Sequence, residues 1–123
     1  KKRICYIYGD GEQTRDFIYV KDVVNANVLA LDRGDNETID ISTNKPVTIN
    51  ELYKIMKEIN GSSVEFEYKV ARKGDILYSY LDNKKALKCL DWNAEYDIRR
   101  GMKETLNYYN NLLVEMEIAA ETK

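Results

Sequence analysis

Histidine is absent from this chain of 123 residues, and cysteine, proline and tryptophan are scarce. Because Cys5 and Cys89 are the only cysteines and lie far apart in the sequence, no set of nitrogen and sulfur ligands is available for a zinc site. We therefore expect no bound metal and two free thiols, as in a protein of the reducing cytoplasm. No apolar run approaches the roughly 20 residues that a membrane-spanning helix needs, so we expect no membrane partner.

An excess of charge of one sign is also missing. Nineteen Lys and Arg residues face twenty-one Asp and Glu residues, which gives a formal net charge of -2. The charges are spread along the chain, so the sequence has neither a basic face for a nucleic acid nor a polybasic patch. We therefore expect no nucleic acid partner. The length and the hydrophobic content of 44% suit a single domain, 1–123, with one core.

Capping signals and apolar periodicity predict four helices. Thr48 and Glu51 have the spacing with which two side chains cap each other's backbone amides, so one helix should begin there and end at Gly61. The others are predicted at about 21–32, at 83–90 and from 97 towards the C-terminus. Two helices should bury an apolar face: Val24, Val28 and Leu31 in the first, and Ile98, Met102, Leu106, Tyr109, Leu113 and Met116 in the last.

Runs of β-branched and aromatic residues predict strands at 4–8, 16–20, 38–42 and 64–68. The last run alternates apolar and charged residues and should be half-buried. Together with the helices, these strands predict a mixed α/β (α+β) fold without the even strand–helix–strand repeat of a complete doubly wound sheet. The pattern is that of a sheet without some of its neighbours.

Two short segments carry candidate ligand chemistry. Arg15 lies between a glycine turn, residues 9–11, and an apolar run, where its guanidinium could make bidentate contacts with a phosphate. Arg72 and Asp75 enclose Gly74, which allows a turn that directs the arginine to a diphosphate and the carboxylate to ribose hydroxyls. For all three charged residues a solvated surface role is the alternative. The glycine turn lacks the further glycines of a phosphate loop and is interpreted as a plain turn.

These segments belong to a longer succession of motifs. The block G-x-G-x-Q-x-R-D, with V-x-D after it, fills residues 9–22, and six segments follow in a fixed order: Ile39 to Ser42, Thr48 to Leu52, Arg72 to Asp75, Ser79 to Ala86, Leu90 to Trp92, and Gly101 to Tyr109. The succession resembles the C-terminal part of the extended short-chain dehydrogenase/reductase family, which includes NAD-dependent nucleotide-sugar epimerases of the UDP-glucose 4-epimerase type and dehydratases.

The resemblance implies roles for five residues. Arg15 and Arg72 would bind the diphosphate of a nucleotide sugar such as a UDP- or dTDP-hexose, and Asp75 would bind the ribose hydroxyls. Gln13 would lie near the ribose or the base, and Phe17 would line the same pocket. By the same resemblance, Asp22 and Asp82 are helix caps and residues 90–92 are packing residues. Departures from the family pattern put local turn geometry in doubt at four positions: Asp40, Ser42, Asp91 and Ala94.

The family's dinucleotide-binding loop, G-x-x-G-x-x-G, does not occur in this sequence. Tyr80 and Lys84 have the spacing of the catalytic pair Y-x-x-x-K, but they lie in a different motif, so no catalytic residue is assigned. The sequence also opens on Lys1 without an initiator methionine, which suggests a piece of a longer polypeptide or, alternatively, a processed small protein.

The resemblance therefore implies the substrate-binding part of a Rossmann-type enzyme without its N-terminal dinucleotide-binding region. Such a chain would be inactive alone and cytoplasmic, and its partners would be the missing Rossmann domain and further copies in a homo-oligomer. NAD would be bound by the full-length parent and not by this chain. A nucleotide-sugar 4,6-dehydratase or decarboxylase is an alternative parent, and a free-standing nucleotide-binding or interaction module is an alternative function.

Overall fold

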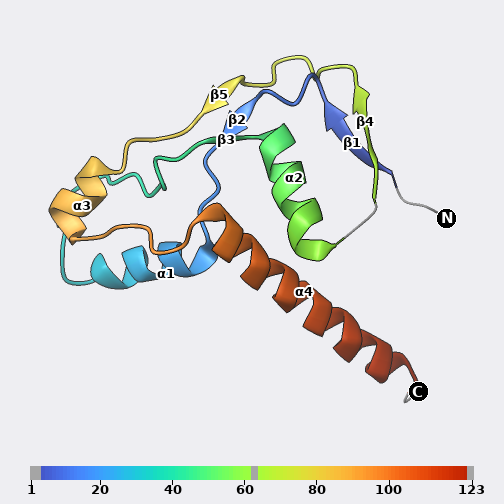
Figure 1. Cartoon of the computed structure of the whole chain (residues 1–123). Coiled ribbons are helices and arrows are strands. Elements are labelled where there is room, and N and C mark those ends of the chain that lie inside the picture. Colours follow the sequence, from blue (N-terminus) through green and yellow to red (C-terminus); the bar gives the residue numbers. More distant parts are fainter. Residues whose placement is uncertain (1–3, 62–63, 122–123) are drawn as a thin grey trace.

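The computed structural model describes residues 4–61 and 64–121 (Figure 1). Over these residues the fold is mixed α/β, as the sequence predicts. The elements are β1 (Cys5–Tyr8), β2 (Thr14–Arg15), α1 (Val20–Leu29), β3 (Val47–Thr48), α2 (Ile49–Asn60), β4 (Phe66–Lys69), β5 (Tyr78–Ser79), α3 (Lys84–Leu90) and α4 (Ile98–Glu121).

The strands form two small sheets. β1 and β4 pair in parallel, with Cys5 opposite Phe66 and Tyr8 opposite Lys69. β2 lies between β3, to which it is antiparallel, and β5, to which it is parallel. Because β5 lies beside β2, the turn that precedes β5 is brought close to the residues that precede and form β2. This pairing positions the candidate site.

The strand predictions at 16–20 and 38–42 are wrong, since the structure has no strand in either range. A strand requires a neighbour for its backbone hydrogen bonds, and within the described residues no strand pairs with either segment. Their side chains Ile18, Ile39 and Ile41 pack against the core instead. The strand predicted at 64–68 occurs slightly later, as β4, and only Phe66 within it is half-buried.

The core lies between α1 and α3. Ala26 of α1, Ala86 and Leu90 of α3, and Trp92 form one buried cluster. Trp92 also donates its indole N–H to the backbone oxygen of Asp22 over 3.0 Å. This bond ties the segment after α3 to the first turn of α1, so the packing role predicted for residues 90–92 is confirmed at Leu90 and Trp92.

Asp22 is a buried anchor, so its prediction as a helix cap is wrong. Its side chain is only 2% exposed, and its two carboxylate oxygens accept the backbone N–H groups of Glu95 and Tyr96 over 3.1 and 3.2 Å. α1 is preceded by Tyr19, which makes no side-chain capping bond. Asp82, in contrast, accepts the backbone N–H of Lys84 at the start of α3 over 2.9 Å, as predicted.

Helix α2 agrees with its prediction at both ends. The Thr48 hydroxyl accepts the backbone N–H of Glu51, and the Glu51 carboxylate accepts the backbone N–H of Thr48. Gly61 ends the helix in the left-handed conformation, with φ of 59°. These local signals need no distant partner, which is why the sequence alone predicts them.

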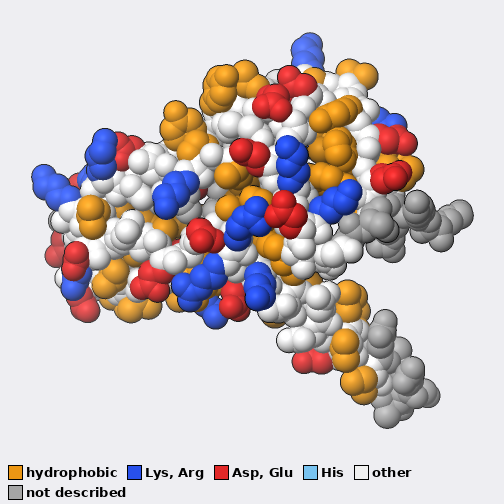
Figure 2. Space-filling view, viewed as in Figure 1, with side chains coloured by type: hydrophobic (Ala, Val, Ile, Leu, Met, Phe, Trp, Pro, Cys, Tyr) orange, Lys and Arg blue, Asp and Glu red, His pale blue; other side chains and the backbone are white. Residues whose placement is uncertain are grey.

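The predicted burial is wrong for α1 and only partly correct for α4. In α1 the expected apolar face is exposed, with Leu31 just beyond the helix at 80%, and Asp22 and Ala26 are buried instead. In α4 the first apolar residues, Ile98, Met102 and Leu106, are half-buried, whereas Tyr109, Leu113 and Met116 are exposed. α4 projects from the rest of the molecule (Figure 1), and hydrophobic side chains lie on its visible surface (Figure 2). Periodicity shows which residues share a face but not whether another element covers it.

The buried carboxylate of Asp22 leads to a stability prediction. We expect Asp22→Ala to lower the free energy of unfolding by about 2 to 4 kcal/mol, because two part-buried backbone N–H groups lose their acceptor. Urea denaturation followed by circular dichroism measures this loss. Asp32→Ala is the matched control, because Asp32 is exposed and should change stability by less than about 0.5 kcal/mol. Equal effects of the two substitutions would contradict the role of Asp22.

Candidate functional site

The glycine turn at residues 9–11 is a plain turn, as predicted, and it is fastened to the start of α2. Gly9 and Gly11 have φ of 79° and 77°, which favour glycine. The backbone N–H of Asn50 donates to the oxygen of Gly11 over 3.1 Å, and its side-chain amide donates to Asp10 and Glu12. The turn is therefore held in place by the first turn of a helix.

Gln13 follows this turn and faces the end of β1. Its side-chain Nε2 donates to the backbone oxygen of Tyr8 over 2.8 Å. Its own backbone oxygen accepts the N–H of Ile49 over 3.2 Å. Both ends of the residue are thus fixed by the chain itself.

Arg15 is joined to the turn before β5. Its Nη1 donates to the backbone oxygens of Thr14 and Ile76 over 2.8 and 2.7 Å, and its Nη2 donates to Oδ1 of Asp75 over 2.7 Å. Arg15 and Asp75 are 60 residues apart in the sequence, and their side chains are 28% and 35% exposed. An arginine has five N–H donors, so Arg15 retains two that are not used in these bonds.

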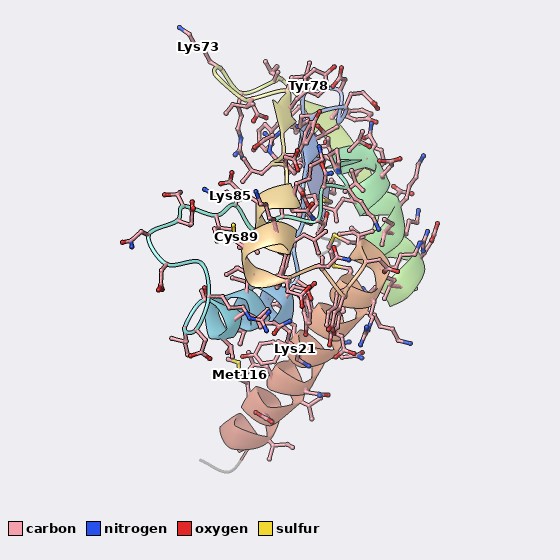
Figure 3. The ribbon with its side chains drawn as sticks, turned by 90° about the vertical axis from the view of Figure 1, so that its left-hand side faces the viewer. Lys21, Lys73, Tyr78, Lys85, Cys89 and Met116 are labelled. Carbon is pink, nitrogen blue, oxygen red and sulfur yellow. The ribbon has the colours of Figure 1, made fainter. Side chains whose placement is uncertain are left out.

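Arg72 begins the same turn and lies over an aromatic ring. The centre of its guanidinium is 4.0 Å from the ring centroid of Tyr8. Within residues 4–61 and 64–121, no hydrogen-bond acceptor contacts this guanidinium. The turn is closed by the N–H of Asp75, which donates to the oxygen of Arg72 over 3.1 Å, and by Gly74 with φ of 83°. Lys73, next in the turn, points away from the molecule (Figure 3).

Phe17 lies at a different place. It lines a hollow of about 460 Å³ together with Thr43, Lys45, Val47 and residues 94–98, and the other four predicted site residues do not line this hollow. The structure thus brings Gln13, Arg15, Arg72 and Asp75 together around the end of β1 but does not add Phe17 to them. A shared pocket that includes Phe17 stays a prediction.

Two residues near the site were missed by the sequence analysis. Tyr8 contacts both Gln13 and Arg72, but an aromatic residue at the end of a strand has no pattern that distinguishes it from a core residue. Asp16 accepts the backbone N–H groups of Thr43 and Asn44 and the hydroxyl of Thr43. The sequence marks Asp16 only as a carboxylate beside Arg15. Its role could not be predicted, because its partner Thr43 lies 27 residues away.

Two departures from the family pattern can now be located. Asp91, in the place of a glycine, has φ of 56° and ends α3, because aspartate tolerates the left-handed conformation better than most residues. Ser42, also in the place of a glycine, is buried, and its hydroxyl donates to the oxygen of Leu81 over 2.9 Å. Both residues therefore fit the local turns.

The arrangement offers cations and a carboxylate for binding. Lys84, which has the spacing of a catalytic lysine relative to Tyr80, pairs with Asp82 over 3.0 Å.

In the part of the chain that the structure describes, no group of three or more His, Cys, Asp and Glu residues could hold a metal ion. None of the described helices combines the length and the apolar character required to cross a membrane.

Comparison with known proteins identifies close similarity to nucleotide-sugar enzymes. The family model described as GDP-mannose 4,6 dehydratase matches residues 1–105. A putative UDP-glucose 4-epimerase of Methanocaldococcus jannaschii is 44% identical over 111 residues, which are 90% of this chain and 36% of the relative. The chain thus spans about a third of the length of the relatives that it matches.

Solved structures give the same result. The UDP-glucose 4-epimerase of Thermotoga maritima with UDP-glucose matches with a TM-score of 0.88 and 44% identity, over 91% of this chain and 36% of that one. A UDP-glucose-4-epimerase of Stenotrophomonas maltophila, with bound NAD and formylated UDP-arabinopyranose, matches with a TM-score of 0.84 and 27% identity, over the same shares. The fold corresponds to the C-terminal part of such enzymes.

The glycine turn that places Gln13 leads to a second stability prediction. A Cβ at position 11 would lie 2.1 Å from Oδ1 of Asn50, whereas a Cβ at Gly61 would contact nothing within 4 Å. Both positions have positive φ, so Gly61→Ala measures the conformational cost alone, about 1 to 2 kcal/mol. We expect Gly11→Ala to lower the free energy of unfolding by more than Gly61→Ala does in urea titrations. Equal losses would show that Asn50 moves aside without cost.

Proposed function

Because this chain belongs to the extended short-chain dehydrogenases/reductases, within the family that the GDP-mannose 4,6-dehydratase model describes, we propose that it is the nucleotide-sugar-binding part of an NAD-dependent epimerase. The observation that carries the proposal is the meeting of Arg15, Arg72 and Asp75 at one turn. Two guanidinium groups and a carboxylate match the diphosphate and the ribose diol of a UDP- or dTDP-hexose.

The open hydrogen-bonding positions support specific roles. Among the described residues no acceptor uses the planar set of donors of Arg72, so we assign it as the bidentate ligand for the diphosphate. Arg15 contributes its two remaining donors to the same group. One carboxylate oxygen of Asp75 accepts a hydrogen bond from Arg15. The other oxygen accepts a ribose hydroxyl. Gln13 borders this group, and Phe17 contributes once the rest of the pocket is present.

The redox step belongs to the parent enzyme. NAD is bound in solved structures that resemble this chain, but the glycine fingerprint that holds it does not occur in this sequence. In the parent, bound NAD would supply the hydride acceptor for oxidation of a sugar hydroxyl. Among the residues that the structure describes we assign no base to the removal of the hydroxyl proton, so we propose that the chain is inactive alone and binds no NAD.

A second parent enzyme is a nucleotide-sugar 4,6-dehydratase, which the description of the matching family model favours. A decarboxylase would use the same binding group, because the diphosphate and the ribose are common to all these substrates. A free-standing nucleotide-binding module would keep this group and lack the redox partner. We also propose a cytoplasmic location, since Cys5 and Cys89 are free thiols.

Nucleotide binding by the chain itself tests the proposal. We expect UDP and UDP-glucose to bind in isothermal titration calorimetry, and we expect no conversion of UDP-glucose when NAD is added. Arg72→Ala should weaken UDP binding about tenfold or more, and Arg72→Lys should not restore it, because an ammonium group lacks the planar fork. Lys73→Ala is the matched control: it removes one positive charge from the same turn at a side chain that points away.

A double-mutant cycle separates a shared ligand from two independent effects. Arg15→Ala and Arg72→Ala, measured alone and together, should be non-additive by more than about 0.5 kcal/mol if both contact one diphosphate. Additive effects would argue against the shared ligand, and absence of UDP binding by the unaltered chain would refute the proposed function.

Exposed apolar surface supports a polypeptide partner. A hollow of about 300 Å³ is lined almost wholly by apolar groups, mainly from β1, α2 and Leu106 of α4. Further apolar side chains are exposed elsewhere on α1 and α4. Surface of this kind marks an interaction site. We propose that it is covered by the missing Rossmann domain in the parent and by further copies of this chain when the chain is alone.

Self-association is therefore expected for the isolated chain. Sedimentation velocity over a concentration series should show mass that increases with concentration, because exposed apolar side chains leave water on contact. A chain that stays monomeric at the highest concentration and unfolds cooperatively would contradict this expectation and would favour the free-standing module.

A further inference from the structure

Tyr8 connects two of the proposed ligand-binding side chains. It is the last residue of β1, where its backbone is paired with Lys69 of β4. Its ring is 4.0 Å from the guanidinium centre of Arg72, and its backbone oxygen accepts Nε2 of Gln13 over 2.8 Å. Tyr8 itself is held by a strand, whereas Arg72 lies in an exposed turn. The ring is therefore the fixed member of the pair.

The two arginines of the site are held in different ways. Arg15 is anchored by three hydrogen bonds to backbone and carboxylate oxygens. Arg72 has the face of the Tyr8 ring, and within the described residues it has no hydrogen-bond acceptor. A guanidinium that lies over an aromatic face keeps its in-plane N–H groups free for a ligand. Stacking also restricts the rotamers of a long side chain before a ligand binds, which reduces the entropy lost on binding.

We propose that Tyr8 is a positioning residue, which presents the guanidinium of Arg72 to the diphosphate of the nucleotide. This inference rests on the proposed function and adds to it the residue that orients one phosphate ligand. It assigns the action of Tyr8 to its aromatic face, since no hydrogen bond of its hydroxyl is found in the described part of the chain. A phenylalanine at position 8 should therefore keep the positioning of Arg72, and an aliphatic residue should lose it.

The same strand offers a matched control. Tyr6 has Lys69 over its ring, with Nζ 4.6 Å from the centroid, and it lies two residues before Tyr8 on β1. Tyr6 lines the apolar hollow, and within the described residues no hydrogen bond or cation–π contact joins it to Arg72 or Gln13. Tyr6→Leu therefore removes a tyrosine ring and a cation contact from β1 and leaves the candidate site intact.

The test compares UDP with uridine as ligands of the full chain. Titration calorimetry should show that Tyr8→Leu weakens UDP binding about two- to fivefold, the effect of one cation–π contact at an exposed site, and leaves uridine binding unchanged. Tyr8→Phe and Tyr6→Leu should bind UDP as the unaltered chain does. Equal losses for UDP and uridine would overturn the proposal, because they would indicate a structural defect or a direct contact of Tyr8 with the nucleoside.

A second measurement follows the contact without any ligand. In spectra of the chain labelled with ¹⁵N at arginine, the Nε–H resonance of Arg72, assigned by Arg72→Lys, should carry an upfield ring-current shift that is lost in Tyr8→Leu and kept in Tyr8→Phe. Unaltered binding of UDP by a folded Tyr8→Leu chain would overturn this inference and leave the proposed function standing. Absence of UDP binding by the unaltered chain would overturn both.

Discussion

The pairing of β2 with β5 is the constraint on which the candidate site depends. Thr14 donates its backbone N–H to Leu77, and the guanidinium of Arg15 then reaches Ile76 and Asp75. The ion pair is partly exposed and contributes about 1 kcal/mol or less, so it does not hold the turn by itself. The backbone pairing brings the turn before β5 to β2, and the hydrogen bonds of Arg15 to Ile76 and Asp75 orient that turn. The glycine turn, fastened to α2, sets where β2 begins.

A second constraint acts at the other end of the molecule, around Asp22. Its buried carboxylate and its backbone oxygen together fix residues 92–96 against α1. This part of the fold is well packed, whereas α4 and the outer face of α1 carry apolar side chains without cover in the described chain. The candidate binding group therefore lies on a framework that is complete locally, while the surfaces for larger assembly are open.

Local signals in the sequence predicted the local features correctly. The caps of α2 and the cap at Asp82 depend on atoms within a few residues, and the positive φ angles of the plain turn at residues 9–11 depend on its own glycines. The sequence failed where the outcome depends on a distant partner. Within the described residues, 16–20 and 38–42 have strand composition but no paired neighbour, and nothing covers the apolar stripe of α1. Asp22 shows the same limit, because its partners lie more than 70 residues away. The meeting of Arg15 with Asp75 followed from the family resemblance and not from spacing.

The ion pair between Arg15 and Asp75 is compatible with nucleotide binding. If the pair used every donor and acceptor of both groups, a ligand would have to break it and would lose part of its binding energy. Arg15 retains two N–H donors, and Asp75 retains one carboxylate oxygen, so a diphosphate and a ribose hydroxyl can be added without that loss. The pair also holds the two groups at a fixed separation before the ligand arrives. Binding of both parts of a nucleotide then requires adjustment mainly of Arg72, whose guanidinium stacks on Tyr8 and has no hydrogen-bond acceptor among the described residues.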